Sequence, residues 1–378
     1  MTARAPAPHT PPMAAWRERW IGWRNARLAD PGFQRWAARF PLTRPVARRR
    51  AGRLFDTVAG FVYSQVAAAA IETRLLPFLQ AGARTVAEVA AHSGLPPAGA
   101  ARLVKAAAAL GLAERLPGPD ERWALGADGA ALIGNPGVAE MIAHHRILYA
   151  DLADPVARLR ERGGSLASYW AYDAADAARG NPDAAGAVAA YSALMAASQP
   201  GIAAAVLDAY DIRRHGRLLD IGGGQGVFAA AALDRAPRLA ATVFDLPAVV
   251  AHIADPRLAR TGGSFTTDPL PAGHDLVSLI RVVHDHEDAV VAALLARVHA
   301  ALPPGGTLLL AEPMAETPGA EPIGDAYFGL YLWAMGRGEP RSAARLRFLL
   351  MDAGFVRVRE HRTAIPALVR VLAATKAS

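Results

Sequence analysis

Residues 218–226 constrain the fold of this chain more than any other segment. An apolar pair leads to the acid Asp220, and a turn with four glycines follows at once. An alanine-rich helical pattern begins at Val227. Glycines let a backbone turn tightly and approach a ligand, and the N-terminus of the next helix can face a negative group. The segment therefore predicts a strand-turn-helix unit that binds a nucleotide-like cofactor.

A second apolar stretch, residues 241–244, ends in another acid, Asp245. An acid at this place can accept hydrogen bonds from ribose hydroxyls. The glycines run as G-G-G-x-G, whereas dinucleotide sites use G-x-G-x-x-G. Asp220 would repel a pyrophosphate, but it suits the ammonium and sulfonium groups of S-adenosylmethionine. The pattern therefore favours a methyltransferase over a dehydrogenase.

Composition limits the kind of protein. The 378 residues suggest two domains, and the absence of cysteine excludes disulfides, thiolate metal sites and cysteine nucleophiles. The N-terminus lacks the continuous apolar segment of a secretory signal. The longest uncharged apolar stretch, Thr57 to Ile71, is too short to cross a bilayer. We therefore expect a cytoplasmic protein.

Basic residues concentrate in an N-terminal arm, residues 1–53. The arm carries twelve arginines against two acids, so its net charge is +10 and that of the remainder is −3. Aromatic residues recur between the arginines at helical spacing: Trp16, Trp20, Trp23, Phe33, Trp36 and Phe40. A basic helix with an aromatic face suits an anionic membrane surface, so peripheral membrane contact is predicted for residues 14–53. The alternative is that these aromatic residues pack on a partner subunit or on the body of the protein.

The next segment has the pattern of a winged helix. Thr85 and Glu88 form a capping box, a turn and a helix from Ala98 to Leu110 follow, and residues 112–125 suggest a hairpin. Such modules often bind DNA. The recognition helix would offer only Arg102 and Lys105, which is a thin basic face, so no nucleic-acid partner is expected.

The remaining elements complete the predicted architecture. A long helix over 54–80, broken near Pro77, is expected before the winged helix. After it, residues 138–210 are expected to be mainly helical, with a break at 180–182. From Arg217 strands and helices alternate, which predicts a doubly wound, Rossmann-like α/β sheet with an antiparallel edge. Its expected strands are 218–221, 242–245, 263–265, 276–280, 307–311, 355–360 and 367–373. The expected domains are the arm 1–53, a helical and winged-helix domain 54–205, and the α/β domain 206–378.

The fourth of these strands runs into Arg281 and then His284. Its carboxyl end should lie on the same sheet edge as Asp220 and Asp245, where ligands of open α/β sheets bind. A histidine there can act as a general base near neutral pH. Carboxylates near it would orient the ring, and Glu312 and Glu339 are candidates. Residues 284–288 also hold two histidines among three acids, but a second ligand cluster is missing, so no metal is expected.

Seven ordered motifs now resemble the S-adenosylmethionine-dependent O-methyltransferases of the caffeate and acetylserotonin type. They cover residues 220–226, 244–247, 262–265, 281–285, 302–306, 311–313 and 338–341. The resemblance implies an N-terminal winged-helix dimerisation domain and a homodimer. It makes His284 the base, flanked by Glu312 and Glu339. Its cofactor residues are Asp220, Gly222, Gly224, Asp245, Leu246, Ser264, Phe265 and Arg281, with Asp245 at the ribose and Ser264 and Phe265 bordering the adenine. The chain departs from the plant pattern at His286, where a tryptophan is usual.

Further segments narrow the resemblance to the carotenoid O-methyltransferases of purple bacteria. The segments are residues 33–45, 61–65, 134–138 and 144–152. Those enzymes methylate the tertiary hydroxyl of hydroxyneurosporene or demethylspheroidene. The resemblance implies an acyclic carotenoid substrate and a place at the inner, photosynthetic membrane. Three alternatives remain: an O-methyltransferase of an aromatic or polyketide substrate, a C-methyltransferase of a bacteriochlorophyll precursor, and a regulator on the same fold that binds S-adenosylmethionine or DNA.

Overall fold

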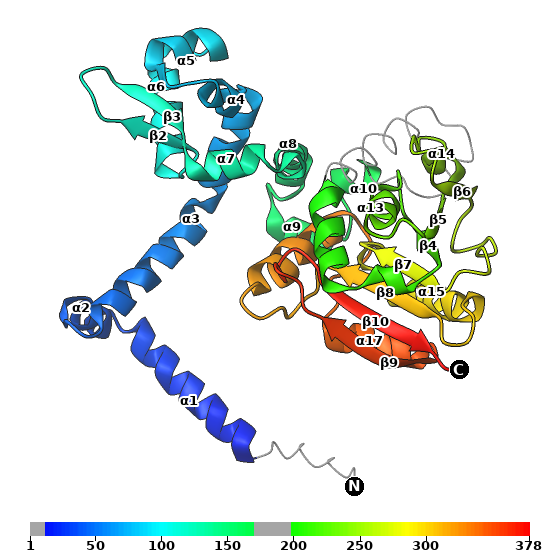
Figure 1. Cartoon of the computed structure of the whole chain (residues 1–378). Coiled ribbons are helices and arrows are strands. Elements are labelled where there is room, and N and C mark those ends of the chain that lie inside the picture. The colour runs from blue at the N-terminus through cyan, green and yellow to red at the C-terminus, as the bar shows by residue number, and fades with distance from the viewer. Residues whose placement is uncertain (1–11, 170–197) are drawn as a thin grey trace. The chain divides into compact units, whose positions relative to one another are not determined.

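The computed structural model describes residues 12–169 and 198–378, and its elements are labelled in Figure 1. The chain divides into two compact units, residues 1–69 and 70–378. The predicted arm boundary at residue 53 falls inside helix α3 (Arg44–Glu72). The predicted break at 180–182 lies outside the described residues.

The first unit consists of helices. Helix α1 (Pro12–Ala29) is followed by α2 (Pro31–Arg39) and by most of α3. The start of α2 is set locally, because Asp30 accepts a hydrogen bond from the Gly32 N–H and Pro31 occupies the first turn, where no N–H is needed. The tryptophans of the described arm, and Phe33, therefore lie on helices as their spacing predicts, and Phe40 caps the end of α2.

Helix α3 is longer than the sequence suggests. Its 29 residues include the stretch that was expected to be too short for a bilayer, and by length and composition alone the helix meets the requirement for crossing a membrane. The expected break near Pro77 is present, but it lies slightly earlier, between Glu72 and Leu75. The chain bends at Arg74, whose φ is 53°, and Pro77 then sits in the first turn of α4 (Leu75–Gln80), where a missing N–H costs nothing.

The winged-helix pattern is confirmed. Helices α5 (Val86–Ser93) and α6 (Pro97–Ala109) precede the hairpin of β2 (Ala113–Leu116) and β3 (Arg122–Leu125), which β1 (Arg84–Thr85) extends. The capping box is formed, because the Glu88 N–H donates to Thr85 and the Glu88 carboxylate accepts from the Thr85 N–H. A second group of helices follows: α7 (Ala127–Ile133), α8 (Pro136–Asp151), α9 (Pro155–Arg160) and α10 (Ser165–Tyr169).

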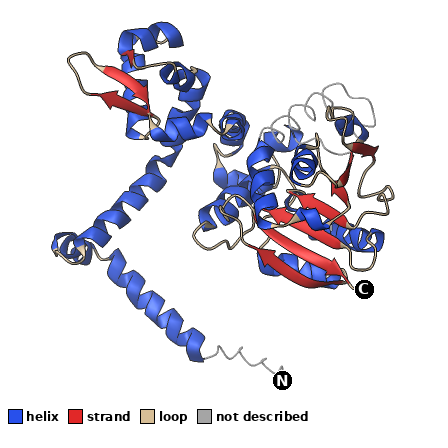
Figure 2. Cartoon of the chain, viewed as in Figure 1, coloured by secondary structure: helices blue, strands red, loops and turns tan. Residues whose placement is uncertain are grey.

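The α/β domain contains one seven-stranded sheet in the order β6-β5-β4-β7-β8-β10-β9, and Figure 2 shows its strands between helices. The strands are β4 (Arg217–Ile221), β5 (Ala240–Asp245), β6 (Ala259–Gly262), β7 (Leu276–Ile280), β8 (Thr307–Glu312), β9 (Phe355–His361) and β10 (Arg370–Lys376). Only the pairs that involve β10 are antiparallel, which confirms the predicted antiparallel edge.

Successive residues of the central strands point to opposite faces of the sheet, and each face has its own core. On one face, α13 (Val227–Arg235) and the helical residues 198–209 pack against the strands. On the other, α15 (Asp288–Ala301) and α17 (Ala343–Asp352) do so. Short helices complete the domain: η1 (Ile212–Arg214), α14 (Pro247–Val250), η2 (Val283–Asp285), the π-helix η3 (Pro322–Phe328) and α16 (Gly329–Ala334).

Two predicted strands differ from the structure. Residues 263–265 do not form a strand, since β6 ends at Gly262 and the Ser264 N–H donates to the Asp268 carboxylate in a tight turn, 2.8 Å away. The last strand begins at Arg370 rather than at Ala367, because residues 365–368 form a turn in which the Leu368 N–H donates to the Ile365 carbonyl.

Candidate active site

Four parallel strands deliver the predicted site residues to one edge of the sheet. β4 ends beside Asp220, β5 at Asp245, β7 next to Arg281 and β8 at Glu312. The glycine turn between β4 and α13 requires left-handed backbone, because φ is 65° at Gly222, 58° at Gly224 and 80° at Gly226. The Gly222 N–H donates to the Phe244 carbonyl at 2.8 Å, which ties this turn to β5.

The two acids of this edge have different surroundings. Asp220 is buried; one carboxylate oxygen accepts from the Ser278 hydroxyl at 2.6 Å, and the other has no partner. Burial raises the pKa of Asp220 to about 7. The carboxylate of Asp245 instead accepts from the N–H groups of Gly224 and Leu246 at 2.8 and 2.7 Å, although burial still raises its pKa. An unpaired buried carboxylate oxygen beside a glycine turn suits a cationic ligand group.

The remaining predicted cofactor residues lie in loops on the same edge. Ser264 and Phe265 follow β6. The Phe265 ring packs edge-on against the His286 ring, with the ring centroids 5.1 Å apart. Arg281 follows β7 with a φ of 58°, and its guanidinium donates to the Ser198 hydroxyl at 3.0 Å. Leu246 caps helix α14. The structure thus gathers all eight predicted cofactor residues at the carboxyl ends of the strands.

His284 and Glu312 form the centre of the site. The Nδ1 of His284 lies 2.5 Å from one oxygen of Glu312, and both side chains are buried. The other oxygen of Glu312 accepts from the N–H groups of Val282 and Val283. Because Glu312 accepts from Nδ1–H, the lone pair of the neutral ring lies on Nε2, which is the atom able to take a proton.

Sequence reasoning did not single out Asp285. Its carboxylate lies 3.2 Å from Nε2 of His284 and is buried, and burial raises its pKa to about 6. Burial alone would lower the pKa of His284, but Asp285 and Glu312 together raise it above its ordinary value. Adjacency to His284 was the available signal, but neighbouring side chains usually diverge, and only the short helix η2 turns both inward.

Glu339 contacts His284 through its backbone. Its N–H donates to the His284 carbonyl at 2.9 Å, while its carboxylate is 56% exposed and lies 3.7 Å from Arg341. Gly338 allows this approach, because its φ is 76° and a side chain there would meet the His284 carbonyl at 2.1 Å. The structure therefore does not bring the Glu339 carboxylate to the His284 ring, and its catalytic role stays a prediction.

Arg341 was also missed as a functional residue, although it lies in one of the sequence motifs. Its buried guanidinium donates to the carbonyls of Val283 and His286 at 2.7 Å each and to the Asp288 carboxylate at 2.6 Å. These bonds hold the loop that carries His284 from both sides. A buried arginine needs such a complete set of acceptors, because an unpaired buried charge is costly.

Helices form a further wall near His284. Phe328, at the end of η3, meets the His284 ring edge-on at 6.2 Å. The neighbouring Tyr327 hydroxyl lies 2.7 Å from Nε2 of His145 on α8, and burial raises the pKa of Tyr327 to about 12. π-helical turns are rare and occur often at functional sites. Across residues 12–169 and 198–378, His, Asp and Glu side chains do not gather in a group of three able to hold a metal ion.

This fold and site define a methyltransferase of the doubly wound class. The family model for the O-methyltransferase domain matches residues 149–356. The chain is 42% identical to the demethylspheroidene O-methyltransferase of Rhodobacter capsulatus over 89% of its own length and 85% of that protein. It is also 42% identical to the enzyme of that name from Cereibacter sphaeroides, over 86% of this chain and 87% of that one. The chain belongs to the O-methyltransferase family, whose cofactor is S-adenosylmethionine.

Solved structures agree with this assignment. Human N-acetylserotonin methyltransferase in complex with S-adenosylmethionine superposes with a TM-score of 0.74 at 26% identity, over 87% of this chain and 98% of that one. The mitomycin 7-O-methyltransferase MmcR gives a TM-score of 0.69 at 25% identity, over 88% of this chain and 100% of that one. Both neighbours are covered almost completely, so the present chain carries additional residues that they do not match.

Replacing Glu312 by Gln tests the pairing of His284. A neutral ring is the active base, so kcat/KM should rise with pH as His284 loses its proton. Removing the negative charge of Glu312 lowers the pKa of His284, so the rising limb should move to lower pH while the maximal rate falls at least ~10-fold. The pH–rate profile measures both effects, with the exposed Glu321→Gln as control. An unmoved rising limb would show that Glu312 does not tune His284.

Replacing Asp220 by Asn tests whether this carboxylate binds the cofactor. Loss of a charge-assisted contact should weaken S-adenosylmethionine binding by roughly 10-fold or more in calorimetry. Since the pKa of Asp220 is raised to about 7, affinity of the unaltered protein should fall as pH drops below 7 and this carboxylate takes up a proton. Ser278→Ala removes a hydrogen bond that lowers the pKa, so the midpoint should move to higher pH. A full pH dependence in the Asn variant would contradict this role.

Proposed function

We propose that this chain transfers the methyl group of S-adenosylmethionine to the tertiary hydroxyl of an acyclic carotenoid such as hydroxyneurosporene or demethylspheroidene. The likeness to two demethylspheroidene O-methyltransferases, each matched over most of its length, carries the proposal. This places the reaction in spheroidene-type carotenoid biosynthesis. The buried His284 with its two carboxylate neighbours supports the chemistry.

The cofactor residues fit S-adenosylmethionine by their chemistry. Asp220 offers a buried carboxylate oxygen without a partner to a cationic group. The glycine turn lets the backbone approach the ligand, and Asp245 offers a carboxylate to ribose hydroxyls. Ser264 and Phe265 would border the adenine. When bound, the cofactor would supply a methyl group on a positively charged sulfur, and this sulfur would leave as a neutral thioether when the methyl group bonds to the acceptor oxygen.

His284 has the task of removing a proton from the acceptor. A neutral tertiary alcohol is a poor nucleophile, and its free alkoxide is not accessible at neutral pH, so a base must take the hydroxyl proton as the new bond forms. Nε2 takes that proton, because Nδ1 is engaged with Glu312. The resulting imidazolium lies between Glu312 and Asp285, whose carboxylates stabilise the positive charge. Holding the alcohol in line supplies much of the remaining acceleration.

A second candidate acceptor is an aromatic hydroxyl. The chain is 31% identical to mouse acetylserotonin O-methyltransferase and 30% identical to the 3-hydroxy-5-methyl-1-naphthoate 3-O-methyltransferase of Streptomyces sahachiroi. The same base and cofactor residues would serve an aromatic hydroxyl. Methyl transfer to a carotenoid compared with transfer to a phenol distinguishes the two candidates.

The proposal extends to the setting of the enzyme. A homodimer is supported by helix α3, whose exposed apolar side chains recur every three or four residues on one face: Leu54, Phe55, Val58, Phe61 and Val62. A second copy of the chain would cover this face. Residues 14–53 would contact the cytoplasmic surface of the photosynthetic membrane, where a long polyene substrate resides.

An acceptor assay with labelled S-adenosylmethionine tests the function. Demethylspheroidene in detergent should take up label, whereas a caffeate-type phenol should not. His284→Ala should keep cofactor binding and lose roughly 100-fold or more of the turnover, because the base is missing. Label in the phenol alone would discard the carotenoid and keep the methyltransferase. Full turnover of the Ala variant would remove His284 from the mechanism.

Phe61→Asp tests the dimer. A charge placed on the apolar face of α3 should shift the chain from dimer to monomer in light scattering after size-exclusion chromatography, because burying it without a partner is costly. Met351→Asp is the matched control, since Met351 is similarly exposed on α17. A monomeric unaltered chain, or a dimer that tolerates Phe61→Asp, would count against this interface.

A further inference from the structure

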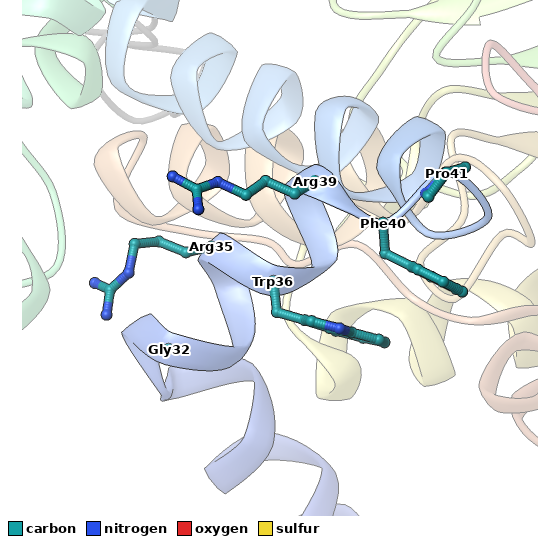
Figure 3. A pocket seen from close by; sticks show the side chains of 6 residues that line it. All are labelled: Gly32, Arg35, Trp36, Arg39, Phe40 and Pro41. Atoms are coloured by element: carbon teal, nitrogen blue, oxygen red, sulfur yellow. The ribbon is translucent and has the colours of Figure 1, made fainter.

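Helix α2 separates two kinds of side chain. Arg35 and Arg39 lie one helical turn apart and extend from one side of the helix, whereas Trp36 and Phe40 extend from another (Figure 3). The rings of Trp36 and Phe40 are stacked, with centroids 5.1 Å apart, and are 51% and 40% exposed. With Gly32 and Pro41 these side chains line a shallow pocket. The helix therefore offers a basic edge beside a preformed aromatic platform.

The arginines of this helix form no ion pair with a carboxylate among residues 12–69. Eleven of the arm's arginines fall within the described part of the chain, and none forms an ion pair with a carboxylate that the structure describes. Asp30, at the start of α2, caps the helix by accepting from the Gly32 N–H at 2.8 Å. Two guanidinium groups one turn apart can bind one phosphate through charge-assisted hydrogen bonds.

Arginines lie beside apolar side chains in a second pocket of the first unit as well. A shallow pocket between α1 and α3 is lined by Arg50 and Arg53 together with Leu28 and Leu54. On α1, three tryptophans recur along one stripe and are 64%, 45% and 62% exposed; these are Trp16, Trp20 and Trp23. Arginine beside exposed tryptophan is the composition of a membrane interface, where arginines reach the phosphates and the rings lie at the level of the glycerol groups. A nucleic-acid duplex would satisfy the arginines but leave the tryptophans in water, because its bases are already stacked on one another.

We propose that α2 recognises anionic phospholipid, with the lipid phosphate between Arg35 and Arg39 and with Trp36 and Phe40 inserted beside it at the glycerol level. The inference rests on the proposed membrane contact and specifies its site and its lipid class. The stacked rings need no rearrangement to enter the interface, and the guanidinium groups on the neighbouring side then stand at phosphate height. The remaining arginines of the arm add a longer-range attraction to an anionic surface.

Vesicle flotation of the full chain tests the site. Vesicles of phosphatidylcholine with phosphatidylglycerol should bind the protein, and vesicles of phosphatidylcholine alone should not. Arg35→Gln with Arg39→Gln should lower the partition coefficient at least ~10-fold more than the matched pair Arg17→Gln with Arg19→Gln, which removes the same charge from the same arm. Trp36→Ala with Phe40→Ala should abolish the binding that persists at high salt.

Several results would overturn the inference. Equal losses for the two arginine pairs would mean general attraction without a site on α2. Equal binding to both vesicle compositions would remove the anionic lipid, and release by inorganic phosphate or preference for duplex DNA would point to another ligand. Methyl transfer to carotenoid in detergent is measured separately on the unaltered chain. Transfer without vesicle binding removes the lipid site alone, and vesicle binding without transfer removes the carotenoid function alone.

Discussion

The active site depends on one buried carboxylate. Glu312 ends strand β8 and accepts three hydrogen bonds from the segment that follows β7: two from the backbone of Val282 and Val283 and one from His284. The Glu312 carboxylate is shielded from water, so losing one of these hydrogen bonds would leave buried negative charge without a donor, at a cost of several kcal/mol. The adjacent parallel strands therefore fix the position of His284, because their carboxyl ends bring Glu312 within reach.

The acids of this site differ in their hydrogen-bond partners, although all are carboxylates. Asp245 is held by two backbone N–H groups, Glu312 by three donors, and Asp220 keeps one buried oxygen free. Asp285 lies against the basic side of His284. Burial raises the pKa of Asp220, Asp245 and Asp285, so each of these three needs a specific partner or ligand to remain ionised. The carboxylate with the free oxygen is the one suited to a cationic cofactor.

Local chemistry explains what could be predicted from the sequence. The glycine turn, the Thr85–Glu88 capping box, the hairpin of β2 and β3 and strand β7 all depend on residues close together in the chain, and each was found. The strand expected at 263–265 was wrong, since a turn around Asp268 competes with the sheet. The break expected near Pro77 lies slightly earlier, at Arg74, because a helix tolerates proline in its first turn.

The sequence by itself determined the order of strands and helices along the chain, the glycine turn, His284 as the candidate base and the basic, aromatic character of the arm, since these follow from periodicity and residue chemistry. Only the tertiary structure decided which partners meet. It brought Glu312 but not the Glu339 carboxylate to the His284 ring, turned Asp285 inward and buried Arg341 beneath the loop. Most of these contacts join residues far apart in the chain, and one depends on a tight turn. A local sequence pattern does not specify which of these side chains come together, because that is set by how the elements pack.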